Sequence, residues 1–440
     1  MKVMKFGGTS VGKPERMQQV SELITRTDEP VIVVLSALSG TTNALVSIGE
    51  AMASGNRELA KQHIDKLETH YQGFISDLLK AETTLAKAKN IVSEHFEFLN
   101  IILKISFSEA LSKDILAQGE LLSTKLFSVY LKEKKIDHAL IPALEFMAID
   151  ENDEPHVPEI KIKLSRLLQQ HSGKKLFITQ GYICRNARGE VDNLKRGGSD
   201  YSASLIAAAV GASVCEIWTD IDGMHNNDPR IVNKTRPIEQ LSFGEAAELA
   251  YFGAKILHPA SIWPAQFFKV PVKLLNTMEP SAAGTLITEE AGSVGVKAVA
   301  AKDGIIAINI KSSRMLLAYG FLRKIFEVFE KYRTSIDMIT TSEVAVSVTI
   351  DNAGHLDEIV RELEPFGAIS VEKNYSIISV VGNEIVQTPD MLKRLFDALS
   401  SVPVRMVSYG GSKHNVSILT SSEDKTRTLQ LLNKGLFGLE

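Results

Sequence analysis

Apolar and polar positions along the first half of the chain predict short buried strands alternating with amphipathic helices. The clearest strand covers 30–35, a continuous β-branched run that is typical of a parallel strand covered on both faces. Other short strands are expected before Lys5, over 176–179 and over 214–218, and a hairpin is expected over 181–194. This arrangement indicates an α/β protein.

The segment 56–117 is predicted to be helical throughout, because Leu, Ile and Phe are mixed with Lys and Glu along it. We find no chemistry within it and expect it to serve packing, a subunit interface included. At its end, Glu120 precedes the apolar face of a further amphipathic helix. This side chain could point into a cleft, or it could be a solvated residue of a first helical turn, which the helix dipole favours.

The first strand ends in a glycine-rich turn, Lys5-Phe6-Gly7-Gly8-Thr9-Ser10. Two residues without Cβ let backbone N–H groups approach a phosphate closely, and Lys5 adds a positive charge. The next helix begins near Pro14, so turn and helix N-terminus together predict an anion site. A Walker A motif is excluded, because Pro14 stands where that motif needs the Ser or Thr that holds Mg²⁺. A structural glycine turn remains an alternative.

Polar residues gather at the ends of three other predicted strands, where α/β sheets hold their ligands. The strand at 30–35 runs into a segment rich in small and hydroxyl residues that includes Ser36 and Thr42; helix capping is the alternative there. After the hairpin, two cations and a carboxylate fall within six residues and suit a charged substrate. These six residues are Lys195, Arg196, Gly197, Gly198, Ser199 and Asp200.

The strand at 214–218 is followed by Thr219 and Asp220, and Arg230 further on is suited to binding a phosphate with two hydrogen bonds. Lys255 and His258 then fall between a helix end and a helix restart. We expect His258 to be a packed or capping residue rather than a base.

The pattern changes after 292–295, and we place a domain boundary there. From Gly304 the predicted order is strand, helix, strand, strand, helix, strand, and a similar order starts again at Ser376. Such repetition predicts two copies of one small α+β unit.

Composition narrows the classes of function. The chain has 440 residues, 44% of them apolar, which suggests two to four soluble domains with sizeable cores. A net charge of −4 with interspersed signs gives no indication of nucleic acid or membrane partners. Cys184 and Cys215 lie far apart without a CxxC motif, so disulfide and zinc scaffolds are disfavoured and a reducing cytoplasm is expected. We find neither a signal peptide nor a membrane-spanning stretch.

Taken together, these motifs resemble those of aspartokinases, in the amino acid kinase family. They are KFGGTS at Lys5, SG-TTN around Thr42, GE at Glu120, RGGSD at Arg196, TD-DG-DPR from Thr219 and FGAKILHP around Lys255. The resemblance implies a mainly parallel sheet flanked by helices in a catalytic domain over 1–295, followed by two ferredoxin-like ACT domains. The first would cover 296–375 and be completed by about 435–440, and the second would cover 376–434.

The resemblance also implies an activity, transfer of the γ-phosphoryl of MgATP to the β-carboxylate of L-aspartate. The product, 4-phospho-L-aspartate, leads to lysine via diaminopimelate, to threonine and to methionine. Lys5 and Asp200 would be catalytic, and Mg²⁺ would arrive with ATP rather than on protein ligands. ATP would contact Lys5, Phe6, Gly7, Gly8, Thr219, Asp220, His225, Arg230 and Lys255, although many family members have Tyr where this chain has His225. Aspartate would contact Ser36, Thr42, Glu120, Arg196, Gly197, Gly198 and Ser199.

The first ACT domain resembles the effector domain of lysine-inhibited aspartokinases, and ACT pairs in this family commonly dimerise. The implied effector residues are Met315, Ser335, Ile336, Asp337, Ser342 and Glu343. A lysine effector brings a side-chain ammonium that needs a carboxylate, which Asp337 and Glu343 offer; Glu343 could instead cap a turn. Leu317 and Ala318 replace more polar family residues, so threonine or a concerted effect stays open. A catalytically silent sensor and a kinase of another small carboxylate are the alternative functions.

Overall fold

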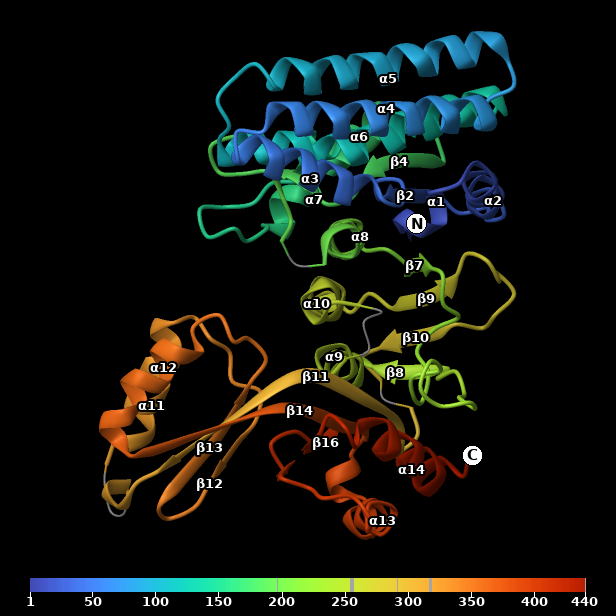
Figure 1. Ribbon diagram of the computed structural model, residues 1–440. Helices are drawn as coiled ribbons and strands as arrows, with labels where there is room; N and C mark the ends of the chain where they lie inside the picture. Colours follow the sequence, from blue (N-terminus) through green and yellow to red (C-terminus); the bar gives the residue numbers. More distant parts are fainter. Residues whose placement is uncertain (196, 254–256, 291, 316–318, 440) are drawn as a thin grey trace. The chain divides into compact units, whose positions relative to one another are not determined.

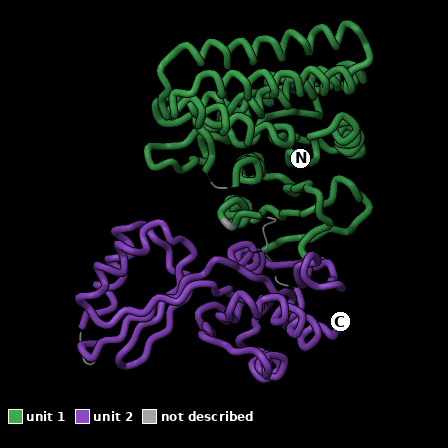
Figure 2. Tube along the Cα trace, viewed as in Figure 1, with its two compact units in different colours: residues 1–224, 257–289 green, residues 225–256, 290–440 purple. Residues whose placement is uncertain are grey.

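The computed structural model describes residues 1–195, 197–253, 257–290, 292–315 and 319–439. Its contacts divide the chain into two compact units, which Figure 2 shows in different colours. Unit 1 comprises 1–224 and 257–289, and unit 2 comprises 225–256 and 290–440. Within the described ranges, no helix has the length and apolar character needed to cross a membrane.

Unit 1 is built on a mainly parallel sheet in the strand order β3-β4-β2-β1-β7-β9-β10. β1 pairs in parallel with β2 and β7, and among the described pairs of these seven strands the β9–β10 pair is antiparallel. Each residue of β2 is buried, as the β-branched run predicts. The strands are β1 (Lys2–Phe6), β2 (Val31–Leu35), β3 (Ala139–Leu140), β4 (Leu176–Gln180), β7 (Cys215–Thr219), β9 (Val272–Asn276) and β10 (Thr285–Thr288).

Helices cover this sheet, and the long ones α4, α5 and α6 lie side by side (Figure 1). α6 packs on β2 and β4, whereas α8 packs on β1, β2 and β7. The hairpin expected over 181–194 is formed by β5 (Ile183–Arg185) and β6 (Val191–Asn193). The helices are α1 (Gly8–Val11), α2 (Pro14–Ile24), α3 (Thr41–Ala53), α4 (Arg57–Leu78), α5 (Glu82–Ile102), α6 (Glu109–Glu133), α7 (Val157–Gln170), α8 (Gly198–Val210) and α10 (Pro259–Phe267), with η1 (Ala143–Glu145).

One detail of the helical segment differs from the sequence-based expectation. Glu120 lies in the middle of α6, which begins eleven residues earlier at Glu109 with Ser108 as its N-cap. The Ser108 side chain accepts a hydrogen bond from the Leu111 N–H, which fixes this start. Glu120 is therefore not a first-turn residue, and it is buried.

Unit 2 contains an antiparallel sheet in the order β12-β13-β11-β14-β16-β15. β11 (Gly295–Lys311) and β14 (Ala368–Asn383) are long central strands that pair with each other along most of their length. The others are β12 (Ile339–Thr341), β13 (Ala345–Ile350), β15 (Met406–Tyr409) and β16 (Asn415–Ser421). The helices are α11 (Phe321–Lys331), α12 (Leu356–Leu363), α13 (Met391–Ala398) and α14 (Lys425–Phe437), with η2 (Ser313–Met315), η3 (Glu364–Phe366) and η4 (Ile385–Gln387). β8 (Gln240–Ser242) and α9 (Phe243–Tyr251) also belong to this unit.

The two repeats correspond to the two halves of this sheet, each with its own core. One core packs α11 and α12 on β11 and β13, and the other packs α13 and α14 on β14 and β16. Residues 435–440 were expected to return and complete the sheet of the first ACT domain. Over 435–439 the chain instead ends α14, and no strand forms there. The first half of β11 instead pairs with 377–383 of β14, because β11 is long enough to serve both halves.

Candidate active site

Lys5 and Asp200 meet at the carboxyl edge of the unit 1 sheet. Lys5 lies near the end of β1, in register with Val34 of β2 and Ile217 of β7, and Asp200 lies in the first turn of α8. The Lys5 Nζ is 2.6 Å from the Asp200 Oδ1, and both side chains are largely buried. The parallel sheet therefore places a shielded cation, held by a carboxylate, where such sheets bind ligands.

The glycine turn after Lys5 is tightly enclosed by backbone. The Gly7 N–H donates to the carbonyl of Trp218 at 3.3 Å. A Cβ added to Gly8 would lie 2.9 Å from the Ala37 carbonyl oxygen, and one added to Gly7 would lie 3.4 Å from the Lys5 Nζ. At Gly8, close approach rather than an unusual φ requires glycine, whereas the contact at Gly7 is with the end of a flexible side chain. The neighbouring Phe6 is fully buried and stacks on Trp218, so only its backbone can face a ligand.

Glu120 presents an unpaired carboxylate oxygen inside the protein. Its Oε1 accepts a hydrogen bond from the Ala37 N–H at 3.2 Å, while the buried Oε2 has no partner in the described structure. Burial raises the pKa of Glu120 to about 7, although the bond from Ala37 opposes this shift. A buried polar atom without a partner is costly, so this oxygen is suited to a ligand that donates hydrogen bonds.

Hydroxyl groups connect the end of β2 with α6 and with the start of α8. The Ser36 Oγ donates to the Ser199 Oγ at 2.8 Å, and the Ser123 Oγ donates to the Ser36 carbonyl at 2.8 Å. Gly197 and Gly198 have positive φ values of 75° and 52°, which glycine adopts without strain. Thr42 is exposed in the first turn of α3. Arg196 lies outside the described residues.

The predicted nucleotide residues are distributed over both units. In unit 1, Thr219 ends β7 and its hydroxyl donates to the Asp220 Oδ1 at 3.2 Å. In unit 2, the His225 Nδ1 lies 2.7 Å from the Thr235 Oγ1. The exposed Arg230 donates to both carboxylate oxygens of Asp228, at 2.9 and 2.7 Å. This pair lowers the pKa of Asp228, chiefly through the side-chain hydrogen bond from Arg230.

Two further predicted positions follow α9, and the structure describes one of them. Lys255 lies outside the described residues. His258 is the N-cap of α10, and its Nδ1 accepts a hydrogen bond from the Ala260 N–H at 3.2 Å. The expectation that His258 is a capping residue is thereby confirmed.

Sequence reasoning missed two tyrosines near Glu120, the fully buried Tyr71 and the half-buried Tyr182. The Tyr71 hydroxyl lies 3.0 Å from the Thr41 Oγ1, which connects α4 to the start of α3. Burial first, and then the charge of Glu120, raise the pKa of Tyr71 far above its usual value. Burial first, and then the charge of Glu120, are also the largest causes that raise the pKa of Tyr182 to about 12. No local signal marks Tyr71, because it occupies an apolar-face position of a helix in which no chemistry was expected.

The predicted effector segment contains a second buried carboxylate, Asp337. Its Oδ1 accepts hydrogen bonds from the Lys302 Nζ and the Tyr251 hydroxyl, both at 2.7 Å. The buried Oδ2 has no partner in the parts of the chain that the structure describes. Lys302 also pairs with Asp351 at 2.9 Å. Burial alone would lower the pKa of Lys302, but the hydrogen bonds to the two carboxylates outweigh it and raise that pKa.

The other predicted effector residues lie at the surface or near it. Glu343 is exposed in the turn between β12 and β13, where the Ser342 N–H donates to the Ala345 carbonyl at 2.8 Å. Ser335 and Ser342 are exposed, and Ile336 and Met315 are half-buried. Leu317 and Ala318 lie outside the described residues. Among the described residues, no group of three or more His, Cys, Asp or Glu side chains is placed to hold a metal ion.

Comparison with known proteins identifies the class. Residues 1–276 match the amino acid kinase family, and 378–436 match an ACT domain. The chain therefore belongs to the amino acid kinase family. Within it, the relatives are aspartokinases, as the motifs indicated. Lysine-sensitive aspartokinase 3 of Escherichia coli is 32% identical, with 99% of each chain covered. Chloroplastic aspartokinase 3 of Arabidopsis thaliana is 35% identical, with 99% of this chain and 81% of the relative covered.

Solved structures agree in fold over the whole chain. E. coli aspartokinase III in complex with aspartate and ADP matches with a TM-score of 0.85 at 30% identity, covering 99% of this chain and 100% of the other. The same E. coli protein in complex with lysine and aspartate matches with a TM-score of 0.81 at 31% identity, covering 99% of both chains. The predicted fold, a kinase sheet followed by ACT-type α+β units, is thereby confirmed.

Proposed function

We propose that this protein is an aspartate kinase that transfers the γ-phosphoryl of MgATP to the β-carboxylate of L-aspartate, giving 4-phospho-L-aspartate and ADP. The observation that carries the proposal is the Lys5–Asp200 pair at the carboxyl edge of the sheet, in the same unit as the unpaired Glu120 Oε2. The E. coli relative, whose structure holds aspartate and ADP, supports the choice of substrates.

The chemistry needs positioning and charge rather than a general base. The β-carboxylate of aspartate is already ionised at neutral pH, so no proton has to be removed before attack. Lys5 and the Mg²⁺ that arrives with ATP neutralise charge on the phosphoryl oxygens during transfer. Asp200 holds Lys5 in place at 2.6 Å. Gly7 and Gly8 are the proposed backbone donors to the phosphates; the Gly7 N–H, which donates to the Trp218 carbonyl at 3.3 Å, would have to share that bond.

Aspartate is recognised through both of its α-substituents. Glu120 receives the α-ammonium on its free Oε2, and Arg196 pairs with the α-carboxylate. Gly197, Gly198 and Ser199 shape the turn beside Arg196, while Ser36 and Thr42 supply neutral hydrogen bonds. Thr219, Asp220, His225, Arg230 and Lys255 form the nucleotide side.

We further propose that lysine inhibits the enzyme at the first ACT unit, where its side-chain ammonium pairs with Asp337 and Glu343. The free Oδ2 of Asp337 supports this assignment, and the E. coli relative was solved with lysine. Met315, Ser335, Ile336 and Ser342 complete the effector segment. We also propose that the ACT units associate into a homodimer or a higher oligomer. A cytoplasmic location is proposed as well, and it is consistent with the free, buried thiols of Cys184 and Cys215.

The proposed domains are a kinase domain over 1–295 and ACT units over 296–375 and 376–434. The division by contacts differs in two segments, because it groups 225–256 and 290–295 with the ACT units.

An assay of acyl phosphate formation tests the function. Purified protein is incubated with MgATP, hydroxylamine and either L-aspartate or L-glutamate, and hydroxamate is measured with and without lysine or threonine. We expect hydroxamate from aspartate alone and its suppression by lysine. Product from glutamate instead of aspartate would indicate a sister kinase. No product from either would favour the silent sensor, and inhibition by threonine alone would contradict the effector assignment.

A further inference from the structure

The segment 225–236, which carries the proposed nucleotide residues His225 and Arg230, is anchored on an ACT helix by a buried amide cluster. The Asn433 Oδ1 on α14 accepts a hydrogen bond from the Asn226 Nδ2 at 3.2 Å. The Asn227 Nδ2 donates to the Leu429 carbonyl of the same helix at 3.0 Å. All three asparagines are at most 4% exposed. A buried, hydrogen-bonded amide cluster of this kind fixes one arrangement of the elements that it joins.

Asn433 itself is fully engaged. Its Nδ2 donates to the carbonyls of Lys234 at 3.0 Å and Leu439 at 3.2 Å. Its Oδ1 therefore contacts the beginning of the segment, and its Nδ2 contacts a residue near the end. One side chain on α14 thus spans the loop that contains Arg230.

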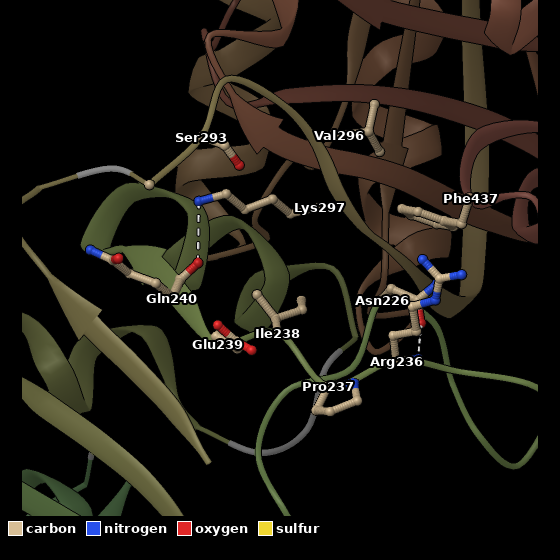
Figure 3. A pocket seen from close by; sticks show the side chains of 11 residues that line it. Asn226, Arg236, Pro237, Ile238, Glu239, Gln240, Ser293, Val296, Lys297 and Phe437 are labelled. Atoms are coloured by element: carbon tan, nitrogen blue, oxygen red, sulfur yellow. Dashed lines mark hydrogen bonds between the residues drawn. The ribbon is translucent and has the colours of Figure 1, made fainter. Parts of the chain in front are cut away.

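Further contacts tie the same segment to the core and to the sheet. The Val232 side chain belongs to the hydrophobic core that α14 shares with β14 and β16. The Val299 N–H of β11 donates to the Asn226 carbonyl at 2.8 Å, and the Arg236 N–H donates to the Asn226 Oδ1 at 2.6 Å. Figure 3 shows Asn226 and Arg236 together in the lining of a pocket that also includes Phe437, the last residue of α14.

Arg230 stands between two of these anchors, Asn227 and Val232. Its guanidinium is exposed and held only by the neighbouring Asp228 among the contacts that the structure gives. A short loop fixed at both ends moves with the element that fixes it. The position of α14 therefore sets the position of Arg230.

We propose that Asn433 is a positioning residue for the nucleotide: through Asn226 and Lys234 it sets the place of His225 and Arg230, and so makes MgATP affinity depend on the second ACT unit. This inference rests on the proposed function, since it takes both residues as nucleotide contacts. Coupling between two binding sites is reciprocal, so MgATP in turn favours the arrangement of α14 that Asn433 holds.

The test compares two buried polar residues of the same helix. Asn433→Leu keeps the approximate volume and removes the hydrogen bonds to the 225–236 segment. Thr428→Val is the matched control. Thr428 is fully buried, and in the described structure its hydroxyl donates only to the Asp424 carbonyl, one turn earlier on the same helix. Melting temperature, the KM for ATP and the KM for aspartate are measured for each, together with calorimetric binding of a non-hydrolysable MgATP analogue.

We expect Asn433→Leu to raise the KM for ATP and the Kd of the analogue about tenfold, with a smaller change in the KM for aspartate. Thr428→Val should lower the melting temperature without changing ATP binding. Equal effects of the two variants on ATP binding, or no effect of Asn433→Leu, would overturn the proposal. If Asn433→Leu does not fold, the same ATP-binding measurements are made on Asn227→Asp. This variant removes the Asn227 amide that donates to the Leu429 carbonyl of α14, and it should weaken ATP binding in the same way.

Failure of this inference is separable from failure of the proposed function. The wild-type protein is assayed for hydroxamate in the same series. Inactive wild type would count against the kinase assignment, and the calorimetric comparison would still decide the role of Asn433. Active wild type with indistinguishable variants would count against Asn433 alone.

Discussion

Glu120 and Ala37 share a single hydrogen bond of 3.2 Å, which satisfies one oxygen of a buried carboxylate and leaves the other without a partner in the described structure. A carboxylate with a free oxygen in a buried site attracts a cation, because the low local dielectric strengthens their attraction. This relationship motivates the assignment of Glu120 to the α-ammonium of aspartate, and it makes binding sensitive to pH.

The KM for aspartate should rise as pH falls below about 7, because burial raises the pKa of Glu120 to about 7 and protonation removes the charge that the ammonium needs. Glu120→Gln should raise the KM at pH 8 and abolish this pH dependence. Steady-state kinetics between pH 6 and pH 8.5 measure both effects. An unchanged pH profile in the variant would reject the role of Glu120.

Glu120→Gln, which should weaken aspartate binding, should increase the thermal stability of the fold at high pH. The folded pKa of Glu120 lies above its unfolded value of 4.5, so the native state holds this proton more tightly. The resulting stability is present at low pH and is lost as pH rises through about 7. Glu120→Gln should therefore melt at a higher temperature than wild type at pH 8, and the gap should narrow towards pH 5. Calorimetry at both pH values measures this, and an equal gap at both would contradict it.

Replacement of Lys5 by Met should lower kcat by about 10²–10³-fold, because no other described cation takes its place beside Asp200. Lys5→Arg is the matched control and should retain more activity, since it keeps the charge. Circular dichroism and lysine binding should show that the ACT units stay folded. Full turnover in Lys5→Met would refute the proposed role of Lys5.

Gly8→Ala should impair ATP binding, because the new Cβ would lie 2.9 Å from the Ala37 carbonyl oxygen and push the turn away from the sheet. Gly73→Ala provides a matched comparison in the exposed interior of α4, where an added Cβ meets nothing within 4 Å. That variant should be more stable by up to about 1 kcal/mol, since Ala is the better helix former. Kinetics and thermal melting of the pair check both expectations. Equal behaviour of the two would mean that close packing at Gly8 has no functional consequence.

Asp337→Asn should raise the lysine concentration for half-inhibition about tenfold and leave the uninhibited rate unchanged. The reason is loss of the charge that pairs with the effector ammonium. Asp351→Asn is the control, because Asp351 pairs with the same Lys302 but lies outside the effector segment. Inhibition curves for the three proteins separate the two carboxylates. If Asp351→Asn shifts the inhibition curve as far as Asp337→Asn does, the shift comes from the lost ion pair with Lys302. That result would contradict a direct contact between Asp337 and the effector.

Local patterns predicted the elements that carry the kinase motifs. The β-branched run before Ser36 forms β2, the glycine turn after Lys5 starts α1, and the alanine-rich segment after Gly197 forms α8. Each of these depends on neighbours in sequence. Parallel strand order and the start of α8 then bring Lys5 and Asp200 together. Their joint role was expected only from the resemblance to aspartokinases, because no local pattern links the two residues.

Contacts between distant parts of the chain were not predictable in the same way. Asn226 and Asn433 are 207 residues apart, and nothing in the local pattern of either marks a partner. The buried hydroxyl pair of Tyr71 and Thr41 was missed for the same reason, since apolar periodicity does not reveal a hydrogen bond between helices. The position of Glu120 inside α6 was missed because an apolar face was taken as the start of a helix that begins earlier, at Glu109.

The most direct test of the account is to identify which carboxylate of aspartate is phosphorylated. The enzyme is incubated with MgATP and L-aspartate, the acyl phosphate is reduced with borohydride, and the products are separated. Transfer to the β-carboxylate predicts homoserine, formed only with ATP and strongly reduced in Lys5→Met. Absence of homoserine, or reduction to 3-amino-4-hydroxybutanoate from the α-carboxylate, would contradict the proposed reaction.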